Sequence, residues 1–346
     1  MTSLEESISK GRNTLSADRL DMSFGEIMNM YSADELVIDP DFQRLFRWDI
    51  AQRTRFIESL LLGIPIPSIF VAEDKNGRWE IVDGLQRIST ILSFFGLLKN
   101  SKENKWVLCD GEIVEGLDSL NIDNIPTKFL LNIKRSACRI EVIKWDSKYD
   151  MRYELFNRLN TGGSPLTDQE IRNCIFRGVS PDLTIEIKEL AALPQFIELI
   201  KPSERQSSQL YLDELVLRFY SLFGNHEIKK NISEHMTDFM RDASKNPQLS
   251  TGKKEIFLRT IAILSQLDKN LFKGVNNQLS SSLYDGVMVG ISSYIEHYEK
   301  LKPNEVMAKI NELKEDEEFA KATGVAASYK HRVKTRVERA LIIFRP

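Results

Sequence analysis

The segment Asp83–Arg87 places a carboxylate, a glycine, an amide and a guanidinium in almost consecutive positions. A β-like run precedes it, and apolar residues at helical spacing follow it from Ile88 to Phe95, which predicts a strand-to-helix junction. The first amides of a helix have no partners within the helix, and the helix dipole favours an anion there. Gly84 lets the backbone approach a ligand closely, and Arg87 offers a planar fork to a phosphate group. Asp83 supplies oxygen atoms for Mg²⁺ or for a water molecule.

The same residue types also suit an ordinary turn. In that interpretation Gly84 only turns the chain, Asp83 caps the following helix and Arg87 is solvated. Short glycine motifs are common by chance, so the segment by itself favours the ordinary turn.

Two arginines lie among aromatic residues in the segment Phe42–Trp48, directly before a predicted helix cap at Asp49. In one interpretation, Gln43 and Arg44 direct an amide and a guanidinium at one phosphate group. The alternative is a hydrophobic staple, in which the aromatic rings pack and the arginines are exposed. The residues alone do not decide between the two.

The segment Asn157–Thr167 carries two glycines beside hydroxyl and amide side chains, and it leads into another predicted helix cap. Asn160, Thr161 and Gly162 fit a backbone nest that binds phosphate. A well-made turn between helices uses the same residue types, and the segment by itself favours the turn.

The first half of the chain is predicted to mix helices with short strands. Asp49 and Gln52 form the pattern of a capping box, and Gly63 is a natural end for the helix that begins there. An Asn-Gly pair at 76–77 lies between two β-rich runs, which predicts a hairpin over 68–82. Further elements are predicted as a helix at 24–31, a hairpin at 105–115 and a strand at 139–144.

Beyond residue 150, helices are predicted one after another. Thr167 and Glu170 form a second capping box before an apolar helical pattern. This change of pattern predicts two domains, 1–150 and 151–346, in a chain of the α+β class. The other helices of the second domain are expected near 183–200, 208–223, 229–243, 253–271, 283–300, 304–314 and 328–344.

The composition fits a packed protein of a reducing compartment. The net charge of -3 argues against nonspecific coating of nucleic acid but leaves room for a local basic groove. Three cysteines without a CxxC pair indicate neither a zinc knuckle nor a disulfide framework. The beginning of the chain lacks the apolar run of a secretory leader, and no apolar stretch approaches the roughly 20 residues of a membrane span. We therefore expect a cytoplasmic protein without membrane contact.

Several enzyme classes are disfavoured, because the chain has no P-loop pattern, no nucleophile elbow and no histidine pair with metal-ligand spacing. Cationic residues around the last helix form a candidate DNA-phosphate patch. A solvated helix face explains the same run more simply. The residues of this candidate patch are Lys330, Arg332, Lys334 and Arg336.

Taken together, the three segments resemble the N-terminal domain of GmrSD-type restriction endonucleases, which belongs to the ParB/sulfiredoxin-like superfamily. The family's motifs are Q-R-x-x-x-W, G-I-P-I-P, D-G-Q-Q-R and F-x-R-[IL]-N-T-G-G with a following Q-E-I-R-N. They correspond in order to residues 43–48, 63–67, 83–87 and 156–173. Order and spacing agree, so the resemblance is much more specific than any single motif.

The resemblance implies a ParB/sulfiredoxin-like domain with a small mixed sheet, followed by an all-α region. It also implies that the loop binds a nucleoside triphosphate with Mg²⁺, without indicating which base. The resemblance assigns nucleotide binding to Gln43, Arg44, Gly84 and Arg87. It assigns catalysis to Asp83, Gln86 and Arg87, and metal binding to Asp83. It places Asn160, Thr161 and Gly162 on the rim of the same pocket.

The sequence departs from the family in two ways. Leu85 stands where the family has its first glutamine, so nucleotide binding is better supported than hydrolysis. The HNH nuclease domain that many relatives carry or recruit has no recognisable counterpart. The resemblance still implies an NTP-hydrolysing protein of bacterial anti-phage defence that senses DNA. Because the chain shows no nuclease domain, we expect it to act with a nuclease or another defence protein. It acts alone or as an oligomer. The alternative is a non-catalytic DNA-binding regulator or adaptor, and an intrinsic DNA nuclease is less favoured.

Overall fold

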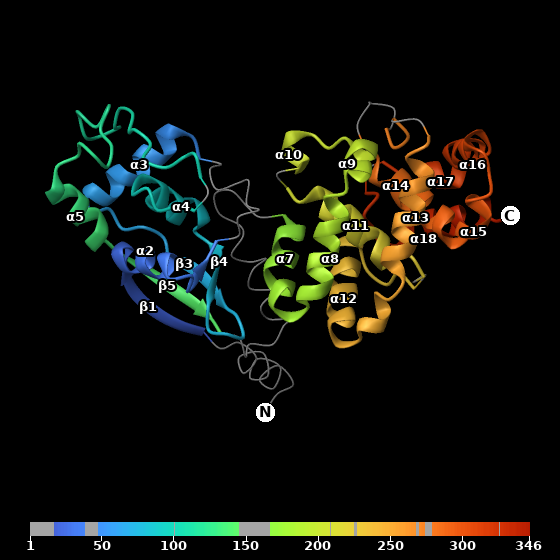
Figure 1. The fold of residues 1–346 in the computed structure, drawn as a ribbon, viewed down its shortest axis with the longest axis horizontal. Helices are drawn as coiled ribbons and strands as arrows, with labels where there is room; N and C mark the ends of the chain where they lie inside the picture. Colours follow the sequence, from blue (N-terminus) through green and yellow to red (C-terminus); the bar gives the residue numbers. More distant parts are fainter. Residues whose placement is uncertain are drawn as a thin grey trace. The chain divides into compact units, whose positions relative to one another are not determined.

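The computed structural model describes residues 17–38, 48–99, 101–144, 167–207, 209–224, 227–267, 270–273, 279–324 and 326–346. The chain divides into two compact units, Met1–Leu166 and Thr167–Pro346, and each is described by itself. Figure 1 shows the strands in the first unit and successive helices in the second.

The first unit contains a five-stranded mixed sheet in the order β1-β5-β3-β4-β2. β1 pairs antiparallel with β5, β5 parallel with β3, β3 antiparallel with β4, and β4 parallel with β2. The predicted hairpin is therefore confirmed as β3 and β4, and Gly77 in its turn has a φ of +80°. The strands are β1 (Ala17–Ser23), β2 (Leu36–Val37), β3 (Ile69–Glu73), β4 (Trp79–Asp83) and β5 (Ala137–Ile143).

Side chains of the helices and the sheet form one hydrophobic core in this unit. Phe24, Ile57 and Leu92 come from three different helices and are fully buried. Asp49 and Gln52 form the predicted capping box at the start of α3. The helices are α2 (Phe24–Ser32), α3 (Ile50–Leu61), α4 (Leu85–Phe94) and α5 (Thr127–Arg135).

The hairpin predicted at 105–115 is wrong, because no strand forms there. The amides of Ile113 and Val114 instead donate to the buried carboxylate of Glu58 on α3, at 2.8 and 2.7 Å. A β-carbon on Gly111 would lie 2.5 Å from Glu58 Oε1. The amides that would have formed a ladder are satisfied by a side chain, so the segment runs as a loop over α3.

In the described part of the second unit, the regular elements are helices, apart from one isolated bridge between Lys273 and Leu279. α14 is buried on all sides from Ser282 to Ser292 and contacts α11, α13, α16 and α18, so it is the central helix of the unit. The helices are α7 (Asp168–Val179), α8 (Pro181–Ala191), α9 (Pro194–Ile200), α10 (Glu204–Ser207), α11 (Tyr211–Leu222), α12 (Ile232–Lys245), the 3₁₀ helix η1 (Pro247–Leu249), α13 (Lys253–Leu264), α14 (Ser281–Ser293), α15 (Ile295–Tyr298), α16 (Pro303–Glu315), α17 (Glu317–Lys321) and α18 (Lys330–Ile343).

The expected α+β class is confirmed, with the small mixed sheet in the first unit and helices in the second. The capping box of Thr167 and Glu170 begins α7 as predicted. The helix expected at 183–200 is two helices, because Pro194 begins a new one. Within the described ranges, we find no helix that combines the length and the apolar character needed to cross a membrane.

Candidate functional site

The segment Asp83–Arg87 lies where β4 ends and α4 begins, as predicted (Figure 1). Gly84 precedes the helix with a φ of +96°, in the left-handed region. A β-carbon on Gly84 would lie 2.9 Å from Cγ1 of Ile69 on β3. The conformation and the close packing both require glycine, so the junction is held tightly against the sheet.

The N-terminus of α4 has no side-chain cap. The first helical hydrogen bond runs from the amide of Ile88 to the carbonyl of Gly84, at 3.0 Å. The amides of Leu85, Gln86 and Arg87 come before that bond, so they have no acceptor within the helix. These amides and the helix dipole favour an anion at this point.

Arg87 is buried behind this loop, with 9% of its surface exposed. Its guanidinium donates to the carbonyl of Pro67, to the carbonyl of Ser68 at 3.2 Å, and to Oδ2 of Asp83 at 2.9 Å. Burial lowers the pKa of Arg87, and the charge of Asp83 opposes that shift. The side chain therefore ties the end of the G-I-P-I-P segment to the loop, and its fork is engaged by protein acceptors.

These contacts contradict two of the three features of the ordinary-turn interpretation. Asp83 makes no cap hydrogen bond to α4 but pairs with Arg87, and Arg87 is buried rather than solvated. The junction is thus a braced structure in which the N-cap residue Gly84 makes no side-chain cap hydrogen bond to α4.

The carboxylate of Asp83 lies partly open, with 40% of the side chain exposed. Oδ2 accepts from Arg87, and Oδ1 has no partner within the described residues. The described residues contain no group of three or more histidine, cysteine, aspartate or glutamate side chains that could hold a metal ion. Oδ1 of Asp83 is thus an oxygen ligand of the kind that Mg²⁺ takes.

Gln86 connects the loop to Trp48. Gln86 Oε1 accepts from the amide of Trp48 at 3.2 Å, and the Trp48 ring packs edge-on against Phe56 with 5.7 Å between centroids. Arg53 on α3 donates to the carbonyl of Trp48 at 3.0 Å. The end of the segment Phe42–Trp48 thus lies against the first turn of α4, so two of the three segments meet at one place.

Residues 24–177 match the family model described as GmrSD restriction endonuclease, N-terminal domain. This chain carries a GmrSD N-terminal domain. The domain confirms the family that the motifs suggested, and it associates the chain with restriction-type anti-phage defence. No curated protein and no solved structure matches the chain.

Five predicted site residues of the GmrSD domain lie outside the described residues. Their predicted contacts with a nucleotide stay predictions. They are Gln43, Arg44, Asn160, Thr161 and Gly162.

The last five residues of the family's fourth motif have a structural role that the sequence analysis did not assign. Gln169, Arg172 and Asn173 are buried on α7, at helical spacing. Arg172 Nε donates to Gln169 Oε1 at 3.0 Å, and its Nη1 donates to the carbonyl of Ser233 on α12 at 3.2 Å. The spacing of these polar residues at i, i+3 and i+4 could have predicted that they share one face of α7. Through Arg172, this face contacts α12.

The candidate DNA patch loses Arg336, which is completely buried. Its Nη2 lies 3.0 Å from Oδ2 of the buried Asp285. Helical spacing explains the correction, because Val333, Val337 and Ala340 form the inner face of α18 and position 336 lies on that face. Arg336 is therefore part of the core.

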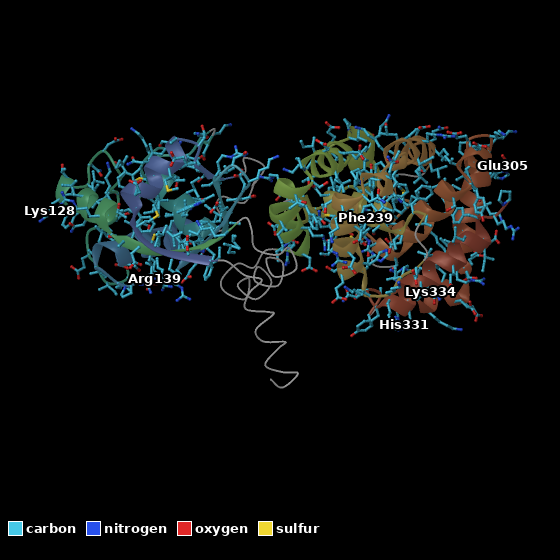
Figure 2. All side chains as sticks on the ribbon, turned by 90° about the horizontal axis from the view of Figure 1, so that it is seen from below. Lys128, Arg139, Phe239, Glu305, His331 and Lys334 are labelled. Atoms are coloured by element: carbon cyan, nitrogen blue, oxygen red, sulfur yellow. The ribbon has the colours of Figure 1, made fainter. Side chains whose placement is uncertain are left out.

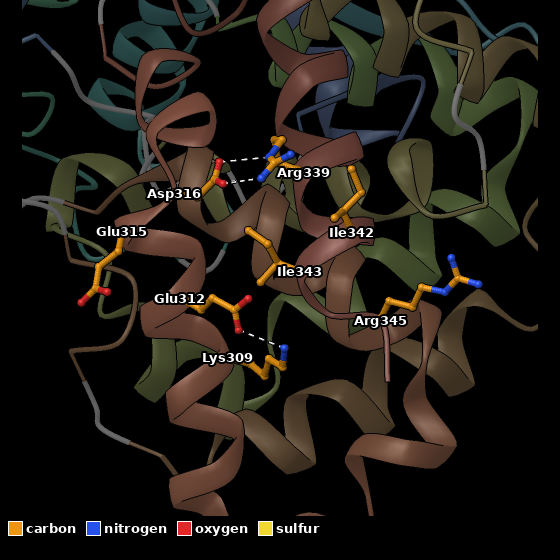
Figure 3. A pocket seen from close by; sticks show the side chains of 8 residues that line it. All are labelled: Lys309, Glu312, Glu315, Asp316, Arg339, Ile342, Ile343 and Arg345. Carbon is orange, nitrogen blue, oxygen red and sulfur yellow. Dashed lines mark hydrogen bonds and ion pairs between the residues drawn. The ribbon is translucent and has the colours of Figure 1, made fainter.

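The other cationic side chains of α18 differ from one another. Lys330 and Lys334 are exposed, and Figure 2 shows Lys334 at the surface of the unit. Arg332 donates to the carbonyl of Thr323 at 3.0 Å. Figure 3 shows Arg339 facing Asp316 at a hollow between α16 and α18, with 3.1 Å from Nε to Oδ1. Only part of the predicted run is thus available at the surface.

Proposed function

We propose that the GmrSD domain of this chain binds a nucleoside triphosphate with Mg²⁺ at the segment Asp83–Arg87, and that it hydrolyses the nucleotide in anti-phage defence. The N-terminus of α4 carries the proposal, because it begins at Gly84, which makes no side-chain cap hydrogen bond. It offers consecutive backbone amides at the positive end of a helix, and Gly84 keeps side-chain bulk away from them.

The side chains around these amides have different roles. The amides and Arg44 hold the phosphate oxygens, and Oδ1 of Asp83 binds the Mg²⁺ that neutralises them. Arg87 braces the loop through Pro67 and Ser68 and adds positive charge behind it. Gln86 accepts a hydrogen bond from the amide of Trp48 and so holds this residue against the loop.

Hydrolysis would be the attack of a water oxygen on the terminal phosphorus, with cleavage of the bond to the leaving diphosphate oxygen. The amides and Arg44 would stabilise the negative charge that develops on the phosphoryl oxygens, and a Mg²⁺ ion held by Asp83 would supply further positive charge. Leu85 is partly buried against the core, and its side chain has no amide group to orient the water. We therefore propose slow hydrolysis on a well-formed binding site.

A phosphate-release assay with each of the four NTPs and Mg²⁺, with and without DNA, tests this function. Arg44→Ala should reduce release by about tenfold or more, which corresponds to about 1.4 kcal/mol. Arg19→Ala is the matched control, because Arg19 is 77% exposed on the edge strand β1 and pairs with Glu141. Equal release from wild type and Arg44→Ala, or no nucleotide binding by either, would contradict the proposal.

Leu85→Gln restores the glutamine of the family's motif and separates binding from turnover. The variant should bind nucleotide as tightly as wild type and release phosphate several-fold faster, because a side-chain amide then lies beside the phosphates. Unchanged release would show that this position does not limit hydrolysis.

The departure at Leu85 also favours a second candidate, a non-catalytic DNA-binding regulator that acts with a partner nuclease. Such a protein would bind DNA with a steep dependence on salt concentration and release no phosphate. DNA binding measured at several salt concentrations, beside the phosphate assay, distinguishes the two functions.

A further inference from the structure

The second unit contains a hollow of about 550 Å³ between the end of α11, α12, η1 and the start of α13. A space of this size accommodates a small organic molecule. Phe239 and Leu249 are the apolar residues of a lining that is otherwise mostly charged or polar, and Lys253, the first residue of α13, belongs to it as well.

Lys253 is held in this hollow without a carboxylate partner. Its Nζ donates to the carbonyl of Phe223 and lies 5.2 Å and 5.7 Å from the ring centroids of Phe223 and Phe239. No carboxylate within the described residues lies within 4.0 Å of it. The positive end of α13 also disfavours an ammonium at this position.

The other titratable groups that line the hollow have partners other than Lys253. Nε2 of the buried His235 lies 3.0 Å from the carbonyl of Ser221, and burial lowers the pKa of this histidine, so its imidazole is neutral near pH 7. Every carboxylate that lines the hollow has a cationic partner other than Lys253. The pairs are Glu227 with Lys229 at 3.1 Å, Asp238 with Lys230 at 2.9 Å and Asp242 with Arg241 at 3.5 Å.

The neighbouring residue Lys254 has the opposite environment. Its Nζ lies 3.0 Å from Oε2 of Glu189, and this hydrogen bond raises the pKa of Lys254. Burial lowers the pKa of Lys253 to about 8. Of two consecutive lysines, the first is thus a neutral amine in much of the population at mildly alkaline pH, and the second remains an ammonium ion.

We propose that Lys253 is a nucleophilic amine that forms an imine with small aldehydes admitted to the hollow. The lone pair of Nζ attacks the carbonyl carbon and forms a C–N bond, while the carbonyl π electrons move to oxygen. The amine loses its protons and the oxygen leaves as water, so that one C=N bond and one water molecule result. Phe239 and Leu249 offer apolar contacts to an aromatic or short aliphatic aldehyde, and the polar residues of the lining suit polar substituents on it.

Pyridoxal is a suitable probe, with borohydride reduction to trap the imine on the full-length protein. Peptide mass spectrometry then gives the rate of labelling at each lysine. At pH 8, Lys253 should be labelled about tenfold faster than Lys254 or more, because its neutral fraction is larger. Labelling of Lys253 should rise with pH and reach half its maximum near pH 8, the pKa of the amine.

Two variants separate reactivity from structure. Lys253→Arg keeps a cation beside Phe223 but cannot form an imine, so the fast labelling should disappear. Lys254→Arg should leave the fast labelling unchanged. If Lys253 reacts no faster than Lys254 in wild type, the lysine only caps the carbonyl of Phe223 and the proposal is wrong.

Discussion

Gly84 shows how one residue determines whether the junction can form. It combines a φ of +96° with a β-carbon position 2.9 Å from Ile69. The sequence of the segment did not predict this close contact. Ile69 belongs to β3, and β3 lies beside Gly84 only because it pairs with β4 in the folded sheet. The motif indicated that Gly84 is important, and its contact with β3 explains why residue 84 must be glycine.

Gly84→Ala should lower the free energy of unfolding by about 1–3 kcal/mol and abolish nucleotide binding. The added methyl group meets Ile69, so the loop must move away from β3 and its amides lose their alignment. Chemical denaturation and nucleotide titration measure the two effects. Gly77→Ala is the matched control, because Gly77 has a φ of +80° but no atom within 4 Å of the added carbon. Equal losses in the two variants would show that contact with Ile69 is unimportant.

At the scale of elements, strong local patterns predicted most of the fold. Asn-Gly at 76–77 and the capping boxes at 49–52 and 167–170 act within a few residues, and each element that they indicate is present. β1 was missed because its partner β5 lies more than a hundred positions along the chain, with Ala17 opposite Ile143. Its residues are mostly exposed, so they show no alternation.

A side-chain contact from another element explains why the hairpin predicted at 105–115 is absent. The segment 105–115 looked like a hairpin because its composition suits strands. Glu58 on α3 takes the amides of Ile113 and Val114, which a neighbouring strand would otherwise accept. Glu58 is distant in sequence from residues 113 and 114, so the local sequence pattern could not predict that it accepts these hydrogen bonds.

The contact of α14 with the end of α18 depends on Gly290. A β-carbon there would collide with the ring of Phe344. Gly290→Ala should therefore destabilise the protein by about 1–3 kcal/mol, as overpacking of a core does. Thermal and denaturant unfolding measure the loss.

A second substitution tests the cause of that loss. Phe344→Leu shortens the side chain that the new methyl group meets, so Gly290→Ala should be less destabilising in the Phe344→Leu background than in wild type. Strict additivity of the two substitutions would refute the steric explanation.

At the scale of the whole molecule, a buried charge cluster joins helices that are distant in sequence. Arg218 on α11 donates to Asp285 on α14 at 2.8 and 2.6 Å, and Arg336 on α18 lies 3.0 Å from the same carboxylate. Burial disfavours the charge on Arg218, but the pKa of this arginine is raised because Asp285 compensates for it. The sequence showed three charged residues in helices and gave no reason to bring them together.

Asp285→Asn should lower the free energy of unfolding by about 3–5 kcal/mol, because two buried guanidinium groups lose their shared anion. Glu338→Gln is the control, since Glu338 and Lys334 are 3.7 Å apart and each has 55% of its side chain exposed. That change should alter stability by about 0–1 kcal/mol. Similar losses from both substitutions would mean that the buried cluster does not organise the unit.

Lys253 should make the stability of the molecule depend on alkaline pH. Its pKa is about 8 in the folded protein and 10.5 as the ordinary value, so between these pH values the unfolded chain binds more protons. Stability from this group therefore rises from pH 8 to 10.5, by up to about 1.4 kcal/mol per pH unit. Subtracting the unfolding free energies of Lys253→Met from those of wild type at each pH isolates this slope. A flat difference would show that the amine is not buried.

The account of the GmrSD domain depends most on whether phosphates bind at the start of α4. Hydrogen–deuterium exchange of peptides that contain residues 83–88, with and without each NTP and Mg²⁺, measures this directly. The account predicts that exchange of the amides of Leu85, Gln86 and Arg87 slows several-fold with at least one nucleotide, because phosphate oxygens accept their hydrogens. Nucleotide binding that leaves exchange in this segment unchanged, or no binding of any of the four, would contradict it.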